Sequence, residues 1–480
     1  MRLPGSRTLL LAGLTLLAAA IVCAVLVGVH HEPRRRHPVA SGTTTLPAPR
    51  PPANTSTQPS PAPSGFINAS AGDVGPYAAT VRWQTSTPAA ARIEWGPAGL
   101  QTLLWSEVRE PASTAAVTLE GLASSTDYVA RIDAVTSSGR PESATVSFTT
   151  APAPGDAVGR TRDGTILVNG HPFFPFVTWE ECPGQWTPDV GYGIDLFAGN
   201  PCTGLSSLLA AVQGRALAVG TTDDTPGVSG PGLLGWFYSD EADARGLSAS
   251  SLVPGGSGLR FLTLTGHFWS GAAPLPAGRT IYPGLISRAD VVGFDLYPLQ
   301  SLCRPDLVPG VFDAQRSLVT LAAPRPTFQW IEVRQMNCAD PASAVTPSTI
   351  RVESWLAIAG GAHGLGFFPS DWGTAVGATI RGIATRVRQV EPALLQPFIP
   401  VQIEFGTPFV RVSARELHGA LYVIAVNAAT SSTPVRFDVP GLDGRTLTIA
   451  GSNKVIHTHG DVLLATLQAR TAYVLVAPPD

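Results

Sequence analysis

Residues 235–241 read Gly-Trp-Phe-Tyr-Ser-Asp-Glu, and residues 328–332 read Phe-Gln-Trp-Ile-Glu. Both are short, mainly apolar runs that end on a carboxylate, and neither alternates regularly between polar and apolar residues. Runs of this kind are typical of strands buried on both faces, as in a parallel sheet covered by helices. The two segments therefore predict buried parallel strands with an acidic residue at each carboxyl end.

Similar runs lie between residues 165 and 396 and alternate with segments long enough to form helices. Repeated alternation over roughly 230 residues predicts a (β/α)8 barrel, which typically takes about 250. Helices are clearest at Asp313–Ala322, Ser348–Ala359 and Ala378–Val390. The eight predicted strands are Phe173–Trp179, Ile194–Ala198, Ala216–Thr221, Leu233–Ser239, Arg260–Thr265, Val291–Tyr297, Thr327–Val333 and Leu365–Phe368.

The segments on either side of the barrel have a period of two. Alternating runs such as Ala79–Trp83 and Ala91–Gly96 precede it, and Val401–Phe405 and Ala420–Asn427 follow it. This period predicts antiparallel strands packed on one face. The predicted fold is multidomain: a β-sandwich at 64–152, a TIM barrel at 160–397 and a second antiparallel β-sandwich at 398–480.

The N-terminal region predicts the compartment. Arg2 and Arg7 precede an apolar, charge-free run over residues 9–29, which is about the length needed to cross a bilayer. We expect residues 1–37 to be a signal anchor or a signal peptide. Residues 38–63 are rich in Pro, Ser and Thr and predict an extended linker. Both N-terminal alternatives place the folded part outside the cytoplasm, secreted or membrane-anchored at the cell surface.

The composition excludes one class of partner. The net charge is −3, and no basic stripe exists to displace counterions from phosphates. We therefore expect no nucleic-acid binding. The membrane is an expected partner only if the N-terminal segment stays uncleaved, and we expect a monomer.

Several motifs resemble those of clan A glycoside hydrolases. Residues 169–174, Asn-Gly-His-Pro-Phe-Phe, are similar to the hairpin that leads into strand one of that clan, and residues 292–298, Val-Gly-Phe-Asp-Leu-Tyr-Pro, to its strand six. Glutamates end strands four and seven, as they do in the clan. The first sandwich resembles a fibronectin type III domain, with Trp83 in its core and Tyr128 at the tyrosine corner. The last resembles the sandwich found beside many glycosidase barrels.

The resemblance implies a retaining hydrolase with Glu241 as acid/base and Glu332 as nucleophile. One carboxylic acid must protonate the glycosidic oxygen, and a second, ionised carboxylate must capture the anomeric carbon. Retention requires the two carboxyl groups to lie about 5–5.5 Å apart, and inversion roughly 6.5–9.5 Å. The implied substrate is an oligo- or polysaccharide, and we expect no cofactor.

Other residues at the carboxyl ends of the strands are candidates for sugar binding. Each has a structural alternative, such as helix capping for Asp240 or core packing for Tyr297 and for any tryptophan. A residue in this position can also belong to a solvated loop. The candidates are Asp240, Tyr297, Trp372, His267, Asp295, Trp179 and Glu180.

Four cysteines follow predicted barrel strands, and four cysteines allow three pairings. In a barrel, Cys182 and Cys202 follow strands one and two, while Cys303 and Cys338 follow strands six and seven. Each pair then lies on adjacent loops, which predicts the disulfides Cys182–Cys202 and Cys303–Cys338. Their spacings lack a Cys-x-x-Cys pattern, so we expect no metal site.

Two other classes of function compete with the hydrolase. An inactive barrel that binds cell-surface polysaccharide would keep the same fold without turnover. A metallophosphatase can also begin with a fibronectin-like module, but it needs a cluster of Asp and His that the sequence does not offer. A retaining glycoside hydrolase remains the principal hypothesis.

Overall fold

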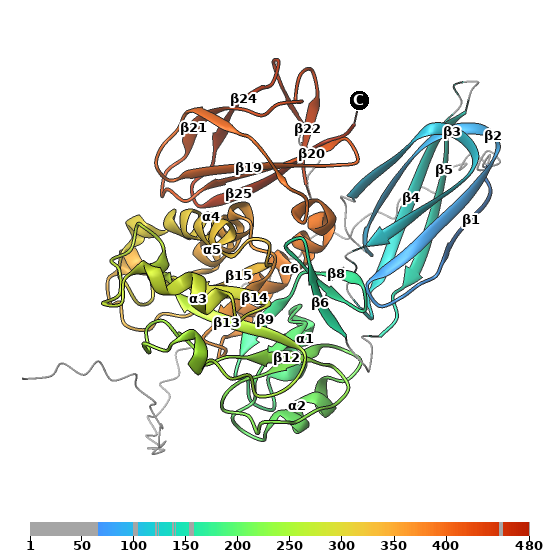
Figure 1. Cartoon of the computed structure of the whole chain (residues 1–480). Helices are drawn as coiled ribbons and strands as arrows, with labels where there is room; N and C mark the ends of the chain where they lie inside the picture. Colours follow the sequence, from blue (N-terminus) through green and yellow to red (C-terminus); the bar gives the residue numbers. More distant parts are fainter. Residues whose placement is uncertain are drawn as a thin grey trace, which may run out of the picture. The chain divides into compact units, whose positions relative to one another are not determined.

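A computed structural model describes residues 66–98, 104–120, 122, 124–136, 139, 141–152, 158–450 and 455–479. The predicted segments 1–37 and 38–63 lie outside these residues. In the described part of the chain, no helix combines the length and apolarity needed to span a bilayer. Figure 1 shows the order of the elements along the chain.

The N-terminal strands form one five-stranded antiparallel sheet with the order β1-β2-β4-β5, and β3 pairs with β2. Two runs predicted as separate strands, Ala79–Trp83 and Ala91–Gly96, belong to a single long strand, because shifts in register near Gln84 and Ala89 let it continue. Trp83 is buried, as predicted. The strands are β1 (Phe66–Gly72), β2 (Ala78–Pro97), β3 (Leu104–Glu120), β4 (Asp127–Thr136) and β5 (Pro141–Thr149).

A small antiparallel sheet of β6 (Gly159–Arg162), β7 (Thr165–Val168) and β8 (His171–Phe173) precedes the barrel. The predicted first barrel strand, Phe173–Trp179, is divided between β8 and β9 (Phe176–Trp179). Pro175 lies between them and cannot donate a backbone hydrogen bond to a neighbouring strand, so the chain leaves one sheet and joins the next at this point.

The eight predicted parallel strands are confirmed as a closed barrel, in which each strand pairs with the next and the last pairs with the first. Each lies within a predicted range, apart from Leu259, which adds one residue to strand five. After β9 they are β10 (Leu196–Ala198), β11 (Leu217–Gly220), β12 (Leu233–Phe237), β13 (Leu259–Thr265), β14 (Val291–Asp295), β15 (Thr327–Glu332) and β16 (Leu365–Phe368).

Helices connect most of the barrel strands, and the three predicted helices are confirmed as α4, α5 and α6. Residues 238–258, between β12 and β13, contain only a 3-10 helix, η1 (Ala249–Ser251). The other 3-10 helices are η2 (Gly266–Phe268), η3 (Arg279–Ile281), η4 (Pro305–Leu307) and η5 (Pro341–Ser343). The α-helices are α1 (Trp186–Gly191), α2 (Leu205–Val212), α3 (Tyr282–Ile286), α4 (Gly310–Ala322), α5 (Pro347–Gly360) and α6 (Thr374–Leu394).

Aromatic side chains fill the interior of the barrel. The Phe237 ring lies 5.1 Å from that of Phe261 and 5.3 Å from that of Trp179, between ring centres. The indole N–H of Trp330 donates to the hydroxyl of Thr263 at 3.0 Å, which satisfies its buried polar atom. The interior is therefore a packed core and not a pore.

These rings leave room only for glycine at some facing strand positions. A Cβ atom on Gly293 of β14 would lie 2.2 Å from the Phe328 ring, and one on Gly366 of β16 would lie 2.1 Å from the Trp330 indole. The Phe328 and Trp330 rings thus occupy the space that a side chain at Gly293 or Gly366 would need.

We predict that Gly293→Ala destabilises the barrel by about 1–3 kcal/mol, because the added methyl group overpacks a closed core. Urea denaturation of the two proteins measures the difference. Gly382→Ala is the matched control: Gly382 lies inside α6, and a Cβ atom there meets nothing within 4 Å. The control should gain about 0.5–1 kcal/mol. Equal stabilities for Gly293→Ala and the wild type would contradict the close contact.

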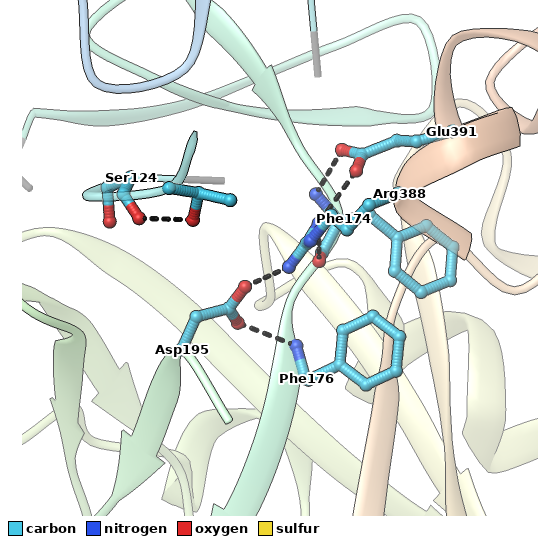
Figure 2. Close-up of polar contacts among 7 residues, drawn as sticks. Ser124, Phe174, Phe176, Asp195, Arg388 and Glu391 are labelled. Atoms are coloured by element: carbon cyan, nitrogen blue, oxygen red, sulfur yellow. Dashed lines mark hydrogen bonds and ion pairs between the residues drawn. The ribbon is translucent and has the colours of Figure 1, made fainter. Parts of the chain in front are cut away.

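A buried ionic cluster closes the barrel at the amino ends of its strands (Figure 2). The Arg388 guanidinium on α6 contacts the carboxylates of Asp195 and Glu391 and donates to the Phe174 carbonyl oxygen at 2.9 Å. The same carboxylates accept from the backbone: Asp195 from the Phe176 N–H at 2.8 Å, and Glu391 from the Phe174 N–H at 3.0 Å. The cluster thereby joins α6 to the chain entering β9 and β10.

The C-terminal segment forms two antiparallel sheets with the orders β17-β19-β20-β25-β22-β23 and β18-β21-β24. Apolar side chains from both sheets, such as Val423 and Phe437, share one core. The strands are β17 (Phe398–Ile399), β18 (Gln402–Phe405), β19 (Val410–Leu417), β20 (Ala420–Asn427), β21 (Thr433–Asp438), β22 (Thr446–Ile449), β23 (Val455–His457), β24 (Val462–Leu467) and β25 (Thr471–Ala477).

Candidate active site

Acidic side chains gather at the carboxyl ends of five barrel strands, which is where barrel enzymes carry their reactive groups. These residues fall into three carboxyl pairs that share hydrogen bonds, with Asp240 beside two of them. The pairs are Glu241 with Asp295, Glu180 with Asp223, and Glu332 with Glu353.

The first pair joins the ends of β12 and β14. Asp295 is the last residue of β14, and its carboxyl group shares a hydrogen bond with that of Glu241. Burial, and then the adjacent Glu241 charge, raise the pKa of Asp295 well above its usual value. Burial therefore favours the protonated, neutral form of Asp295.

The backbone after β12 is fixed in the conformation that aims Glu241. This residue has a φ of 45°, which is uncommon for residues other than glycine and persists only where the surroundings impose it. Asp243 provides that anchor, because it accepts from the Thr265 N–H at 3.0 Å, the Thr265 hydroxyl at 2.6 Å and the Tyr282 hydroxyl at 3.1 Å. Glu241 therefore occupies a preorganised position.

Tyr297 lies among the acidic groups. Its ring stacks on Phe368, with 5.8 Å between ring centres and 20° between planes. Burial raises the pKa of Tyr297 well above its usual value, and the charges of Asp295, Asp240 and the two predicted catalytic glutamates add to this effect. The half-buried phenol therefore stays protonated and is available as a hydrogen-bond donor.

The second pair lies beside the first. Glu180 follows β9 with a φ of 50°, and it accepts from the Thr221 hydroxyl at 3.4 Å and shares a hydrogen bond with Asp223. Burial, and then Asp223, raise the pKa of Glu180 to about 7. Burial, and then Glu241, raise the pKa of Asp240 to about 6. The carboxyl groups of Glu180 and Asp240 are therefore partly protonated near neutral pH.

These raised pKa values predict that the fold is more stable in mild acid than in mild base. The folded protein binds protons that the unfolded chain releases at lower pH, so their stabilising contribution is lost as the pH rises through about 6–7. We expect the melting temperature to be higher at pH 5 than at pH 8, as measured by calorimetry. A melting temperature that rises steadily over this interval would contradict the assignment, and Glu180→Gln should flatten the profile.

Glu332 ends β15 but is completely buried. One oxygen of its carboxylate accepts from the Leu299 N–H at 2.8 Å, and the other accepts from the Gln300 N–H at 2.5 Å. The carboxyl group of Glu353, on α5, is buried and interacts with it. Burial raises the pKa of Glu332 to about 7 against the lowering effect of the two amides. The predicted nucleophile thus lies beneath the loop that follows β14.

The remaining predicted residues lie away from these pairs or have packing roles. Trp179 is half-buried with its ring against Phe237 and Trp330, in the barrel core. His267 bonds through Nδ1 to the Ala273 carbonyl oxygen at 2.6 Å. Trp372 packs edge-on against Phe367 and hydrogen bonds to Asp189. Sugar binding by these three residues stays a prediction.

Sequence reasoning missed Asp223 and Glu353. Asp223 follows predicted strand three in the run Thr-Thr-Asp-Asp, so its position at a strand end was the available signal. Glu353 lies within α5, where nothing in the sequence distinguishes it from a solvated helix position. Among the described residues, no group of three or more His, Cys, Asp or Glu side chains is placed to hold a metal ion.

The structure contains both predicted disulfides, Cys182–Cys202 and Cys303–Cys338. The first joins the loops after β9 and β10, and the second joins the loops after β14 and β15. Such bonds are typical of proteins outside the reducing cytoplasm.

A cavity of about 1060 Å³ lies at the opposite end of the barrel. Its lining includes Arg325 and His363, which precede β15 and β16, and Arg415 of β19. It contains none of the predicted site residues. Because barrel chemistry resides at the carboxyl ends of the strands, we place the candidate active site at the acidic end and not in this cavity.

In comparisons with known proteins, this chain is similar to solved structures, and its sequence matches none of the protein families or curated proteins compared. A GH27 β-L-arabinopyranosidase from Geobacillus stearothermophilus is similar with a TM-score of 0.35 and 11% identity, covering 57% of this chain and 60% of that one. A GH30 endoxylanase from Clostridium papyrosolvens C71 has a TM-score of 0.37 and 12% identity, covering 67% and 98%.

An Anoxybacillus α-amylase has a TM-score of 0.30 and 9% identity, covering 46% of this chain and 59% of that one. This chain thus spans about three fifths of the length of the arabinopyranosidase and of the amylase. The three neighbours are glycoside hydrolases by description. Similarity at this level adds nothing to the assignment of a function, which depends on the site itself.

Proposed function

We propose that this chain is an extracytoplasmic glycoside hydrolase that acts on an oligo- or polysaccharide with retention of configuration. The observation that carries the proposal is the pair formed by Glu241 and Asp295, two acidic side chains at the carboxyl ends of different barrel strands that interact with each other. Glycoside hydrolysis requires one protonated and one ionised carboxyl group at the same bond.

The protonated member of the pair is the general acid. Burial raises the pKa of Asp295 well above its usual value, so Asp295 is protonated and donates its proton to the leaving glycosidic oxygen. The C1–O bond breaks as an oxygen of Glu241 bonds to C1. Asp295, now ionised, takes a proton from water, and the resulting hydroxide replaces Glu241 at C1. This scheme assigns Glu241 the role of nucleophile rather than the predicted acid/base role.

The contact between the two groups supports retention. An inverting enzyme needs roughly 6.5–9.5 Å between carboxyl groups to admit a water molecule, whereas a retaining enzyme needs about 5–5.5 Å. The two interacting carboxyl groups, Glu241 and Asp295, are therefore better suited to the closer, retaining arrangement.

The neighbouring polar groups are suited to sugar hydroxyls. Glu180, Asp223 and Asp240 supply acceptors, and Tyr297 supplies a donor at the same end of the barrel. The two disulfides and the predicted N-terminal segment support action outside the cytoplasm, secreted or anchored in the membrane.

The nucleophile implied by the sequence resemblance, Glu332, stays a prediction. Its carboxylate is fully buried and both of its oxygens are engaged by backbone amides, so attack on a sugar would require the 297–300 segment to move. Asp295 already contacts Glu241 and is therefore the partner that the geometry favours.

Assaying the purified full-length protein against aryl glycosides and cell-wall polysaccharides tests the function. We expect release of the aryl group or of reducing ends, with the product first formed in the configuration of the substrate, as followed by NMR. Binding of a polysaccharide without turnover would replace the hydrolase with the alternative function, an inactive surface-binding barrel. Inverted product would overturn the retaining mechanism.

A further inference from the structure

The loop after β14 is held from below by a buried carboxylate. Its Leu299 and Gln300 N–H groups point at the two oxygens of Glu332, at 2.8 and 2.5 Å. Both loop residues are themselves buried, at 2% and 0% exposure. Buried N–H groups in a loop need acceptors, and a carboxylate with one oxygen for each of two consecutive amides provides them.

Glu353 completes the arrangement from the helix side. It is 1% exposed on α5 and interacts with Glu332, and neither of its two oxygens accepts a hydrogen bond from the described residues. Burial, and then the adjacent Glu332 charge, raise the pKa of Glu353 well above its usual value, so Glu353 is neutral and is able to donate a hydrogen bond to Glu332. Both oxygens of Glu332 accept from backbone amides, with this neutral acid beside them.

The same loop is tied at two further points. The Asn337 N–H donates to the Gln300 carbonyl oxygen at 2.8 Å, and the Cys303–Cys338 disulfide joins the loop to the segment after β15. The residues just before the clamped amides are Asp295 and Tyr297, which lie in the acidic site. By holding Leu299 and Gln300 in place, Glu332 therefore also restrains the backbone that carries Asp295 and Tyr297.

We infer that Glu332 is a positioning residue that clamps the loop after β14, with Glu353 beside it, and so places Asp295 and Tyr297 for reaction. The inference rests on the proposed function for its effect on catalysis, but the clamp itself is a property of the fold. It gives Glu332 a role different from that of a nucleophile.

The test combines hydrogen exchange of the peptide covering residues 296–303 with steady-state kinetics. In Glu332→Gln, the side-chain NH2 faces a backbone N–H, so one clamping bond is lost. We expect exchange at this loop to accelerate about tenfold or more, KM to rise, and kcat to fall by about tenfold. Thermal melting of each variant establishes that it is folded.

Glu353 supplies the matched controls. In Glu353→Gln, the amide donates to Glu332 permanently, so loop protection and turnover should stay within about twofold of the wild type. In Glu353→Leu, the donor is absent, and the loop should loosen as in Glu332→Gln. Rescue by the amide and not by the apolar residue distinguishes a clamp from simple core packing.

Two results would overturn the inference. Unchanged exchange in Glu332→Gln, with turnover lowered by about a thousandfold or more, would make Glu332 the nucleophile after all. Unchanged exchange with unchanged turnover would leave it without either role. If the wild-type protein shows no turnover, the proposed function fails, but accelerated exchange in Glu332→Gln would still establish the clamp.

Discussion

Asp295→Asn is expected to lower kcat/KM on polysaccharide or on an unactivated aryl glycoside by about 10²–10⁴, the usual contribution of a general acid. The asparagine keeps the size of the side chain and removes the acidic proton that burial retains on Asp295. The fold should be retained, because replacing a protonated carboxyl group with an amide introduces no buried charge. Initial rates with purified protein measure the effect.

The choice of leaving group separates the two roles. A dinitrophenyl glycoside leaves without protonation, so Asp295→Asn should retain most of its first chemical step on that substrate. Glu241→Gln removes the group that bonds to C1, and it should lose activity on both substrates to a similar extent. Full activity of either variant on the unactivated glycoside would exclude the proposed pair.

Asp306→Asn is a suitable control. Asp306 lies on η4, more than half exposed in an ion pair with Arg304, and is not one of the acidic pairs. Its replacement should leave kcat/KM within about twofold of the wild type, because exposed ion pairs contribute little. Equal losses in the control and in Asp295→Asn would indicate a general effect of lost charge.

Arg388→Met is expected to produce a large loss of stability, about 3–5 kcal/mol. The guanidinium is 7% exposed and neutralises two carboxylates, Asp195 and Glu391, at the floor of the barrel. Methionine fills much of the volume but leaves both acids buried without their cation. Urea denaturation followed by circular dichroism measures the free energy of unfolding.

The loss should shrink in mild acid. Burial already raises the pKa of Asp195 to about 6 and that of Glu391 to about 7, against the lowering effect of Arg388. Without the arginine both acids can become neutral, so the variant should recover stability towards pH 5. Arg334→Met removes an exposed ion pair with Asp371 and should cost less than about 1 kcal/mol. A comparable loss in both variants would contradict the importance of the buried cluster.

The barrel could be predicted because its signal is local. A strand buried on both faces must be apolar along its whole length, and Thr327–Glu332 is fully buried in the structure. The disulfides followed from strand order alone, because consecutive strands bring their loops together. The long strand β2 could not be read in the same way, since irregularities near Gln84 allow it to continue where the alternation breaks.

For the candidate site, the sequence predicted which acidic residues lie at the carboxyl ends of the strands, but not which of them are in contact. Position identified Glu241 and Asp295, but their contact depends on a left-handed backbone at Glu241 that the sequence does not announce. The direction of the Glu332 side chain, at the end of β15, depends on hydrogen-bond donors from another loop. Leu299 and Gln300 donate to Glu332, and Glu353, 21 residues further along the chain, approaches it from α5.

The two disulfides divide the rim of the barrel unequally. One staples the loops after β9 and β10, and the other staples those after β14 and β15. The connections that carry Asp223 and Glu241 contain no cysteine. No disulfide restrains these two connections, so attempts to redirect this scaffold to a new glycan should first diversify residues 225–232 and 244–251, which leaves Asp223 and the glycines packed against Trp236 unchanged.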